Sequence, residues 1–270
     1  MTLSEHALQQ GRSWGTDPEG WARYGEPHNE PLFRAVLDAA AVGPGSRLLD
    51  VGCGSGATLV LARDRGAEVT GLDVCDPLLA IARDRLPGDD LVVGEADVLP
   101  FPDGSFDAVV GVNAFQFAAD PRTALAEAAR VLAPGGRVVA SLFAEPERSQ
   151  STVIHVALSA LAPAGAAPAQ HAPYLLSEPG NLETAFEGAG LRMVDSGEVP
   201  TVWAYPDREA LVRGILSSAG GAHALTLVDR ATAAAAITGA AEPFVQSDGS
   251  VRMTNMFRWV SAESVAGGSA

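Results

Sequence analysis

A chain of 270 residues with 18 basic and 33 acidic side chains, a net charge of −15 and a pI near 4.6, suits one α/β domain with insertions and a surface that repels nucleic acids. All basic residues are Arg, and the absence of Lys excludes a P-loop lysine, a Schiff-base lysine and the Tyr/Lys pair of short-chain dehydrogenases. Two cysteines, an N-terminus without the apolar core of a signal peptide, and no apolar run approaching a membrane span predict a cytoplasmic protein.

Residues 1–42 are expected to form a cap of short helices. A polar stretch carries three large aromatic residues, Trp14, Trp21 and Tyr24, which either pack a short helix onto the domain or cover a ligand, and both roles are compatible. From Pro31 the apolar residues recur at helical spacing, and the turn at residues 43–45 ends that helix.

The stretch from Arg47 to Asp73 predicts a β-α-β unit, because an apolar run, a glycine turn, a helical segment and a second apolar run follow one another. Gly52, Gly54 and Gly56 let the backbone approach a ligand closely, and the following helix points unpaired N–H groups at it. Asp73 ends the second strand, where a carboxylate can accept both hydroxyls of a ribose. Because these residues also satisfy the loose dinucleotide fingerprint, the unit alone leaves an NAD enzyme and a methyltransferase open.

Alternating helices and strands continue through the middle of the chain and predict a doubly wound parallel sheet. The expected helices are at 77–86 and 121–132, and the expected strands at 91–93, 108–112 and 137–143. Beyond them, 145–180 combines a helical piece with an Ala/Pro/Gly-rich run and is interpreted as a mobile lid. A helix at 181–189, a strand at 191–199, a helical insertion at 206–239 and a last strand at 251–260 complete the prediction.

Three motifs in the right order resemble the class I S-adenosylmethionine (SAM) methyltransferases. They run from Leu48 to Gly56, from Leu99 to Asp107 and from Arg130 to Gly136. Within that family the chain looks like the group that modifies ubiquinone, menaquinone and small natural products, over roughly residues 45–145. The resemblance implies a Rossmann-like, mainly parallel seven-stranded sheet with helices on both faces and an antiparallel last strand. It also implies one methyltransferase domain, with cap helices at 1–42, a SAM-binding core at 43–144, the lid at 145–180 and the rest of the sheet with a helical insertion at 181–260.

The same resemblance places the cofactor. It sets the methionine part of SAM against the glycine turn, the ribose on Asp73 and the adenine edge on Glu95, with Asp97 as the alternative partner because the family usually has Asp at position 95. The full set of implied cofactor-binding residues is Asp50, which holds the loop, with Gly52, Cys53, Gly54, Ser55, Asp73, Val74, Glu95, Ala96, Val112, Asn113 and Tyr24.

The sequence gives less information about the residues that bind the acceptor or remove its proton than about those that bind the cofactor. Phe115 and Gln116 follow the fourth strand and, with Trp14 and Trp203, are the expected substrate-binding residues, although either Phe115 or Phe117 is expected to pack in the core. His155 is the preferred general base, because it follows the fifth strand on a helix beside the expected pocket. No metal site is expected.

The leading hypothesis is a SAM-dependent methyltransferase that methylates an O, N or C nucleophile of a small, partly apolar metabolite in bacterial secondary metabolism and yields S-adenosylhomocysteine (SAH). Such a protein would be a monomer or a homodimer. One alternative keeps the fold and the cofactor but catalyses a non-methylating step such as a cyclisation, or only binds a ligand. An NAD(P)-dependent oxidoreductase remains a third hypothesis, which accounts for the glycine turn but not for the motifs after it.

Overall fold

A computed structural model describes residues 3–163, 175–178 and 180–264, and these form a seven-stranded sheet in the order β3-β2-β1-β4-β5-β7-β6. Neighbouring strands run parallel except where β7 pairs antiparallel with both β5 and β6. The predicted mainly parallel, Rossmann-like sheet is therefore confirmed. The strands are β1 (Arg47–Val51), β2 (Glu68–Asp73), β3 (Asp90–Val93), β4 (Phe106–Val112), β5 (Leu132–Phe143), β6 (Leu191–Tyr205) and β7 (Val251–Ser264).

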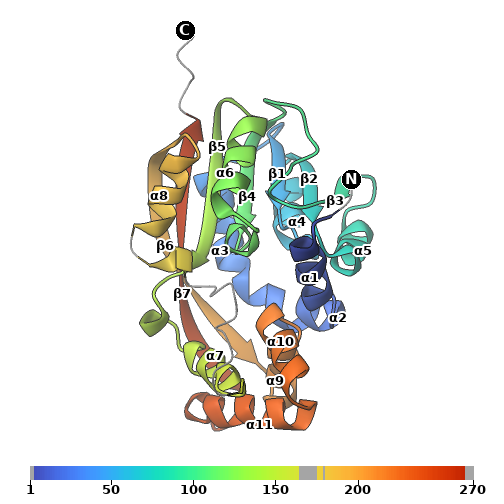
Figure 1. Cartoon of the computed structure of the whole chain (residues 1–270), viewed down its shortest axis with the longest axis vertical. Coiled ribbons are helices and arrows are strands. Elements are labelled where there is room, and N and C mark those ends of the chain that lie inside the picture. Colours follow the sequence, from blue (N-terminus) through green and yellow to red (C-terminus); the bar gives the residue numbers. More distant parts are fainter. Residues whose placement is uncertain (1–2, 164–174, 179, 265–270) are drawn as a thin grey trace.

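Helices cover both faces of this sheet (Figure 1). One face packs against α6 and α8 through Leu125 and Phe186, and the other packs against α3 and α4 through Leu37 and Leu59. Central strands buried on both faces need apolar side chains throughout, as in Val109 to Val110 of β4. The helices are α1 (Glu5–Trp14), α2 (Pro18–Gly20), α3 (Glu30–Ala39), α4 (Ala57–Asp64), α5 (Asp76–Arg85), α6 (Pro121–Val131), α7 (Thr152–Ser159), α8 (Asn181–Gly188), α9 (Arg208–Leu216), α10 (Ala219–Leu227) and α11 (Arg230–Ala241).

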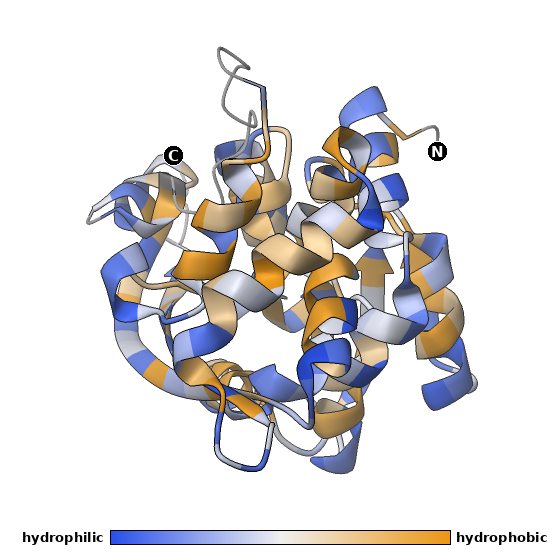
Figure 2. Ribbon diagram, turned by 90° about the horizontal axis from the view of Figure 1, so that it is seen from below, coloured by the Kyte–Doolittle hydropathy of each residue, from blue (hydrophilic) through white to orange (hydrophobic). Residues whose placement is uncertain are grey.

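The strands β6 and β7 extend beyond the rest of the sheet. The last pair between β5 and β7 joins Phe143 to Phe257, so residues 251–256 pair only with β6 among the strands. Around this extension α7, α9, α10 and α11 gather at the bottom of Figure 1, and their apolar residues form a separate cluster with Met253. Viewed from this end, hydrophilic residues lie mostly on the outer helices (Figure 2).

The described helix of the predicted lid lies beside the β6–β7 extension. This helix, α7, packs on α10 and α11 around the β6–β7 extension, where Ile154 and Leu158 are buried. The Ala/Pro/Gly-rich run of the prediction falls largely on residues 164–174, which lie outside the described residues. In the part of the chain that is described, no helix is long and apolar enough to cross a membrane.

Candidate functional site

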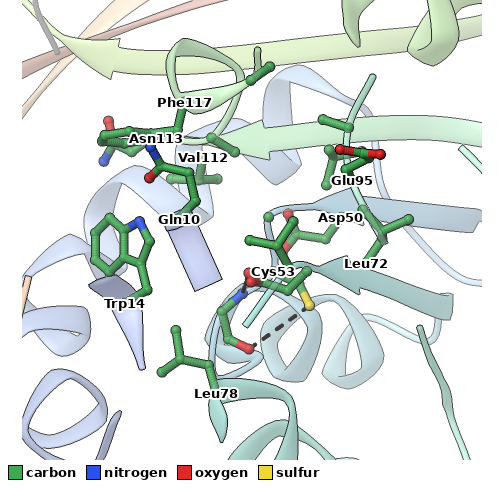
Figure 3. A pocket seen from close by; sticks show the side chains of 18 of the residues that line it. Gln10, Trp14, Asp50, Cys53, Leu72, Leu78, Glu95, Val112, Asn113 and Phe117 are labelled. Atoms are coloured by element: carbon green, nitrogen blue, oxygen red, sulfur yellow. Dashed lines mark hydrogen bonds between the residues drawn. The ribbon is translucent and has the colours of Figure 1, made fainter. Parts of the chain in front are cut away.

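A cavity opens at the carboxyl ends of β1, β2 and β4, under the N-terminal helix α1. Together with the open solvent at its mouth it spans about 1060 Å³. Figure 3 shows Gln10 and Trp14 of α1 on one side, with Asp50 and Glu95 across from them. The predicted site residues that line it are Trp14, Asp50, Gly52, Cys53, Gly54, Asp73, Val74, Glu95, Ala96, Val112 and Asn113.

The glycine turn between β1 and α4 presents bare backbone to the cavity. Gly52 and Gly54 have φ values of 73° and 55°, in the left-handed region that favours glycine. A side chain added at Gly54 would point into open space, with Trp21 Nε1 the nearest atom at 4.0 Å. At Gly52 it would stop 2.6 Å from the Ala114 Cβ. The turn therefore leaves room for a ligand at Gly54.

Asp73 holds this turn and also faces the cavity. Its two carboxylate oxygens accept hydrogen bonds from the backbone N–H groups of Gly54 and Cys75, both at 2.8 Å. Burial raises the pKa of Asp73, although these N–H groups favour its charged form. Each oxygen keeps a lone pair that a ligand hydroxyl can use.

A buried ion pair ties the N-terminal cap to the turn. Glu26, in the 3₁₀ turn Glu26–Asn29, accepts from the Ser55 hydroxyl and from Arg85 Nη1, each at 2.6 Å. Arg85 also donates to the Ser55 carbonyl at 2.9 Å. Ser55, fully buried, thus turns away from the cavity, while Glu26 lines it. No pattern around Glu26 or Arg85 in the sequence indicated this role.

The helix α1 covers the cavity from the N-terminal side. The Ser4 hydroxyl caps α1 by accepting from Ala7 N and donates to Glu95 Oε2 at 2.5 Å. His6 Nε2 lies 2.8 Å from the carbonyl oxygen of Phe117. At the other end of α1 the ring of Trp14 packs edge-on against Trp21 and Phe117.

Glu95 and Asp97, the two candidates for the adenine edge, differ in their hydrogen-bond partners. Asp97 accepts from the backbone N–H groups of Ala119 and Asp120, at 3.1 and 2.8 Å, and so fixes the loop after β4. Glu95 instead contacts the movable hydroxyl of Ser4. This arrangement favours Glu95 as the group available to a ligand.

Other predicted residues lie outside the cavity lining. Tyr24 sits in the π-helical turn Trp21–Gly25, which directs Trp21 to the cavity and packs Tyr24 against Gly214. Phe115 is buried in the core over Gly111, and Gln116 is also buried, whereas Phe117 lines the cavity. The expectation that one of the two phenylalanines packs in the core is met.

Trp203 and His155 lie around the β6–β7 extension. Trp203 packs 6.0 Å from the Phe143 ring and stacks 6.2 Å from His28. The ring of His155, on α7, lies 6.1 Å from the Phe143 ring, and burial lowers the pKa of His155 to about 4. Neither residue lines the cavity, and no described residue of 145–180 does. The structure therefore gives no support to His155 as a general base acting there.

Sequence reasoning did not predict several lining residues. Besides Glu26 they include His6, Gln10, Asn29 and Phe33, which come from α1, the 3₁₀ turn and α3. The Oδ1 atoms of Asn29, Asn113 and Asp50 are buried and have no hydrogen-bond partner in the described structure. Asn113 also has φ of 53°, uncommon for a non-glycine residue.

The family model of the methyltransferase domain matches residues 49–140, the stretch that carries the glycine turn, Asp73 and Glu95. Residues 49–140 form a methyltransferase domain. The resemblance found in the sequence is thereby confirmed for this domain. The described residues outside this match include the cap, α8, the strands β6 and β7 and the helices around the β6–β7 extension.

Curated relatives align with the same half of the chain. A demethylmenaquinone methyltransferase of Renibacterium salmoninarum is 40% identical over 113 residues, covering 42% of this chain and 48% of the relative. One from Thermus thermophilus is 41% identical over 128 residues, covering 45% and 58%. The chain thus spans about half the length of the curated relatives it matches.

Solved structures with a similar fold align with most of the chain. The [4+2]-cyclase SpnF superposes with a TM-score of 0.55 at 23% identity, covering 87% of this chain and 81% of that one. Geranyl diphosphate C-methyltransferase from Streptomyces coelicolor, solved with Mg²⁺, geranyl diphosphate and SAH, gives 0.57 at 15% identity, covering 98% and 100%. At these identities the likeness shows the fold alone.

Proposed function

We propose that this protein is a SAM-dependent methyltransferase acting on a small, partly apolar metabolite. The observation that carries the proposal is the cavity itself, because the matched methyltransferase domain supplies its glycine turn, Asp73 and Glu95. The fit to SAM rests on Gly54, where a Cβ would enter the cavity, and on buried acceptor oxygens that face it without partners in the described chain. When bound, SAM supplies a methyl group activated by a sulfonium.

The chain's own residues hold and enclose the reactants. Asp73 accepts the ribose hydroxyls, while Glu95 and the Ala96 N–H receive the adenine edge. Trp14, Trp21 and Phe117 form an aromatic wall over the remaining space, which suits a planar, apolar acceptor and excludes water. Catalysis then depends chiefly on alignment of donor and acceptor.

The acceptor is proposed from the curated relatives, which are demethylmenaquinone methyltransferases. We therefore propose a quinol or a similar ring hydroxyl or carbon as the methylated group. The cytoplasmic location, the monomeric or homodimeric state and the role in bacterial secondary metabolism are proposed from the family resemblance.

The test separates methylation from the alternatives. Calorimetry with SAM, SAH and NADH should show micromolar binding of SAM and SAH, on the order of −7 to −8 kcal/mol, and none of NADH. Incubation with SAM and a panel of naphthoquinols should then release SAH and a methylated product, measured by mass spectrometry. If SAM binds but no acceptor leads to SAH, and a polyene substrate is cyclised instead, the result would favour the cyclase alternative. The [4+2]-cyclase SpnF has a similar fold.

A further inference from the structure

Three buried carboxylates from three elements line one part of the cavity. Glu26 belongs to the 3₁₀ turn, Asp50 to β1 and Asp73 to β2, and they are 5%, 2% and 8% exposed. Among the described residues no such group is arranged to hold a metal ion. The cluster therefore has to be balanced by protein donors, by protons or by a ligand.

Two of the three carboxylates have strong partners. Glu26 is paired with Arg85 and hydrogen bonded to Ser55, and Asp73 accepts two backbone N–H groups. Asp50 has fewer hydrogen-bond partners. The Thr58 side chain hydrogen bonds to its carboxyl group, but Asp50 Oδ1 has no partner in the described chain. An unpaired charge there, away from water, is costly.

Burial and the neighbouring carboxylates both favour the protonated form of Asp50. Burial raises the pKa of Asp50 well above its usual range, and the negative charges of Asp73 and Glu26 raise it further, against the smaller effect of Thr58. Burial and these same charges also raise the pKa of the Cys53 thiol, so Cys53 adds no charge. Arg85, the cation that contacts the cluster, is paired with Glu26. His6, Glu95 and Asp97 are the other titratable residues that line the cavity besides Cys53 and the three carboxylates.

We propose that Asp50 carries a proton in the ligand-free protein and releases it to solvent when the ammonium group of a ligand enters the cavity. This inference rests on the proposed function and makes a free amino group, rather than the nucleoside alone, the feature that Asp50 selects. The ammonium keeps its own protons and donates to the Asp50 carboxylate. The unpartnered oxygens of Asn29 and Asn113 line the same cavity and accept the remaining donors of such a group.

The experiment is calorimetry of SAH binding at about pH 6.5 in two buffers with different ionisation enthalpies. The enthalpy difference should report release of about one proton per SAH, and SAH affinity should rise up to about tenfold per pH unit. The probe 5′-deoxy-5′-methylthioadenosine, which lacks the amino-acid part, should bind without proton release and with affinity independent of pH.

Two variants complete the test. Asp50→Asn should abolish the proton release on SAH binding, while Asp97→Asn, which alters a cavity carboxylate that has backbone partners, should retain it. Circular dichroism establishes that both variants fold. Release that is absent in the parent, equal with the nucleoside probe, or retained in Asp50→Asn overturns the assignment of Asp50. If SAH does not bind the parent at all, the proposed function fails as well.

Discussion

Replacing Arg85 by Met isolates the buried link between the N-terminal cap and the glycine turn. Met keeps most of the side-chain volume but removes the guanidinium that lies 2.6 Å from Glu26 and 2.9 Å from the Ser55 carbonyl. The Glu26 carboxylate, with a side chain only 6% exposed, then retains the Ser55 hydroxyl as its described donor.

The expected cost follows from the burial of the two partners. Breaking a fully buried ion pair costs about 3–5 kcal/mol, because the other charge is left uncompensated. Arg85 is 31% exposed, so solvent screens part of the interaction, and we expect a loss of about 2–3 kcal/mol. Urea denaturation at pH 8, followed by circular dichroism, measures this loss.

Two further variants make the interpretation specific. Arg83→Met removes an exposed pair with Asp76, whose side chains are 44% and 67% exposed, and should cost less than about 0.5 kcal/mol. The double variant Glu26→Gln/Arg85→Met removes the stranded charge and should recover most of the loss. The reasoning is refuted if Arg85→Met is no more destabilising than Arg83→Met, or if the double variant is as unstable as Arg85→Met alone.

Four other perturbations test the cavity. Gly54→Ala should weaken SAH binding at least about tenfold in calorimetry, because the Cβ enters the ligand space at a φ of 55°; unchanged affinity would show that the ligand does not approach the turn. Asp73→Asn should lower both SAH affinity and, by about 1–3 kcal/mol, the stability in urea, and unchanged stability would mean that Asp73 does not hold Gly54. His155→Ala should leave turnover within about twofold, whereas a hundredfold loss in a product assay would place His155 at the acceptor. Burial raises the pKa of Asp50 in the folded protein well above the usual 3.8, so between these two pKa values the folded protein binds more protons than the unfolded chain and loses stability as pH rises from the lower to the higher value. The melting temperature of Asp50→Asn minus that of the parent should therefore increase above pH 5 until the raised pKa is passed, and a difference that stays constant from pH 5 to 8 contradicts this.

The sequence by itself determined the β-α-β core and its ligand-facing turn. Apolar runs bounded by glycine turns specify strands and helices locally, and right-handed connections limit how consecutive parallel strands can be arranged. Since Gly52, Gly54 and Asp73 lie at ends of consecutive elements, their meeting at one sheet edge is fixed by local geometry. The predicted cofactor-binding residues at the ends of β1, β2, β3 and β4 accordingly line the cavity, apart from Ser55.

Only the tertiary structure decided what faces this turn and what covers it. Glu26 and Arg85 are 59 positions apart, and their pairing depends on how the cap packs over α5. Trp21 rather than Tyr24 lines the cavity, and both lie in a π-helical turn, whose side-chain spacing differs from that of a regular helix. The helix α7 packs on the β6–β7 extension and not on the cavity, because its apolar residues are buried against Met253 and the neighbouring helices. Local spacing fixes an element and its apolar face, but the surface against which that face is buried depends on segments far away in the chain.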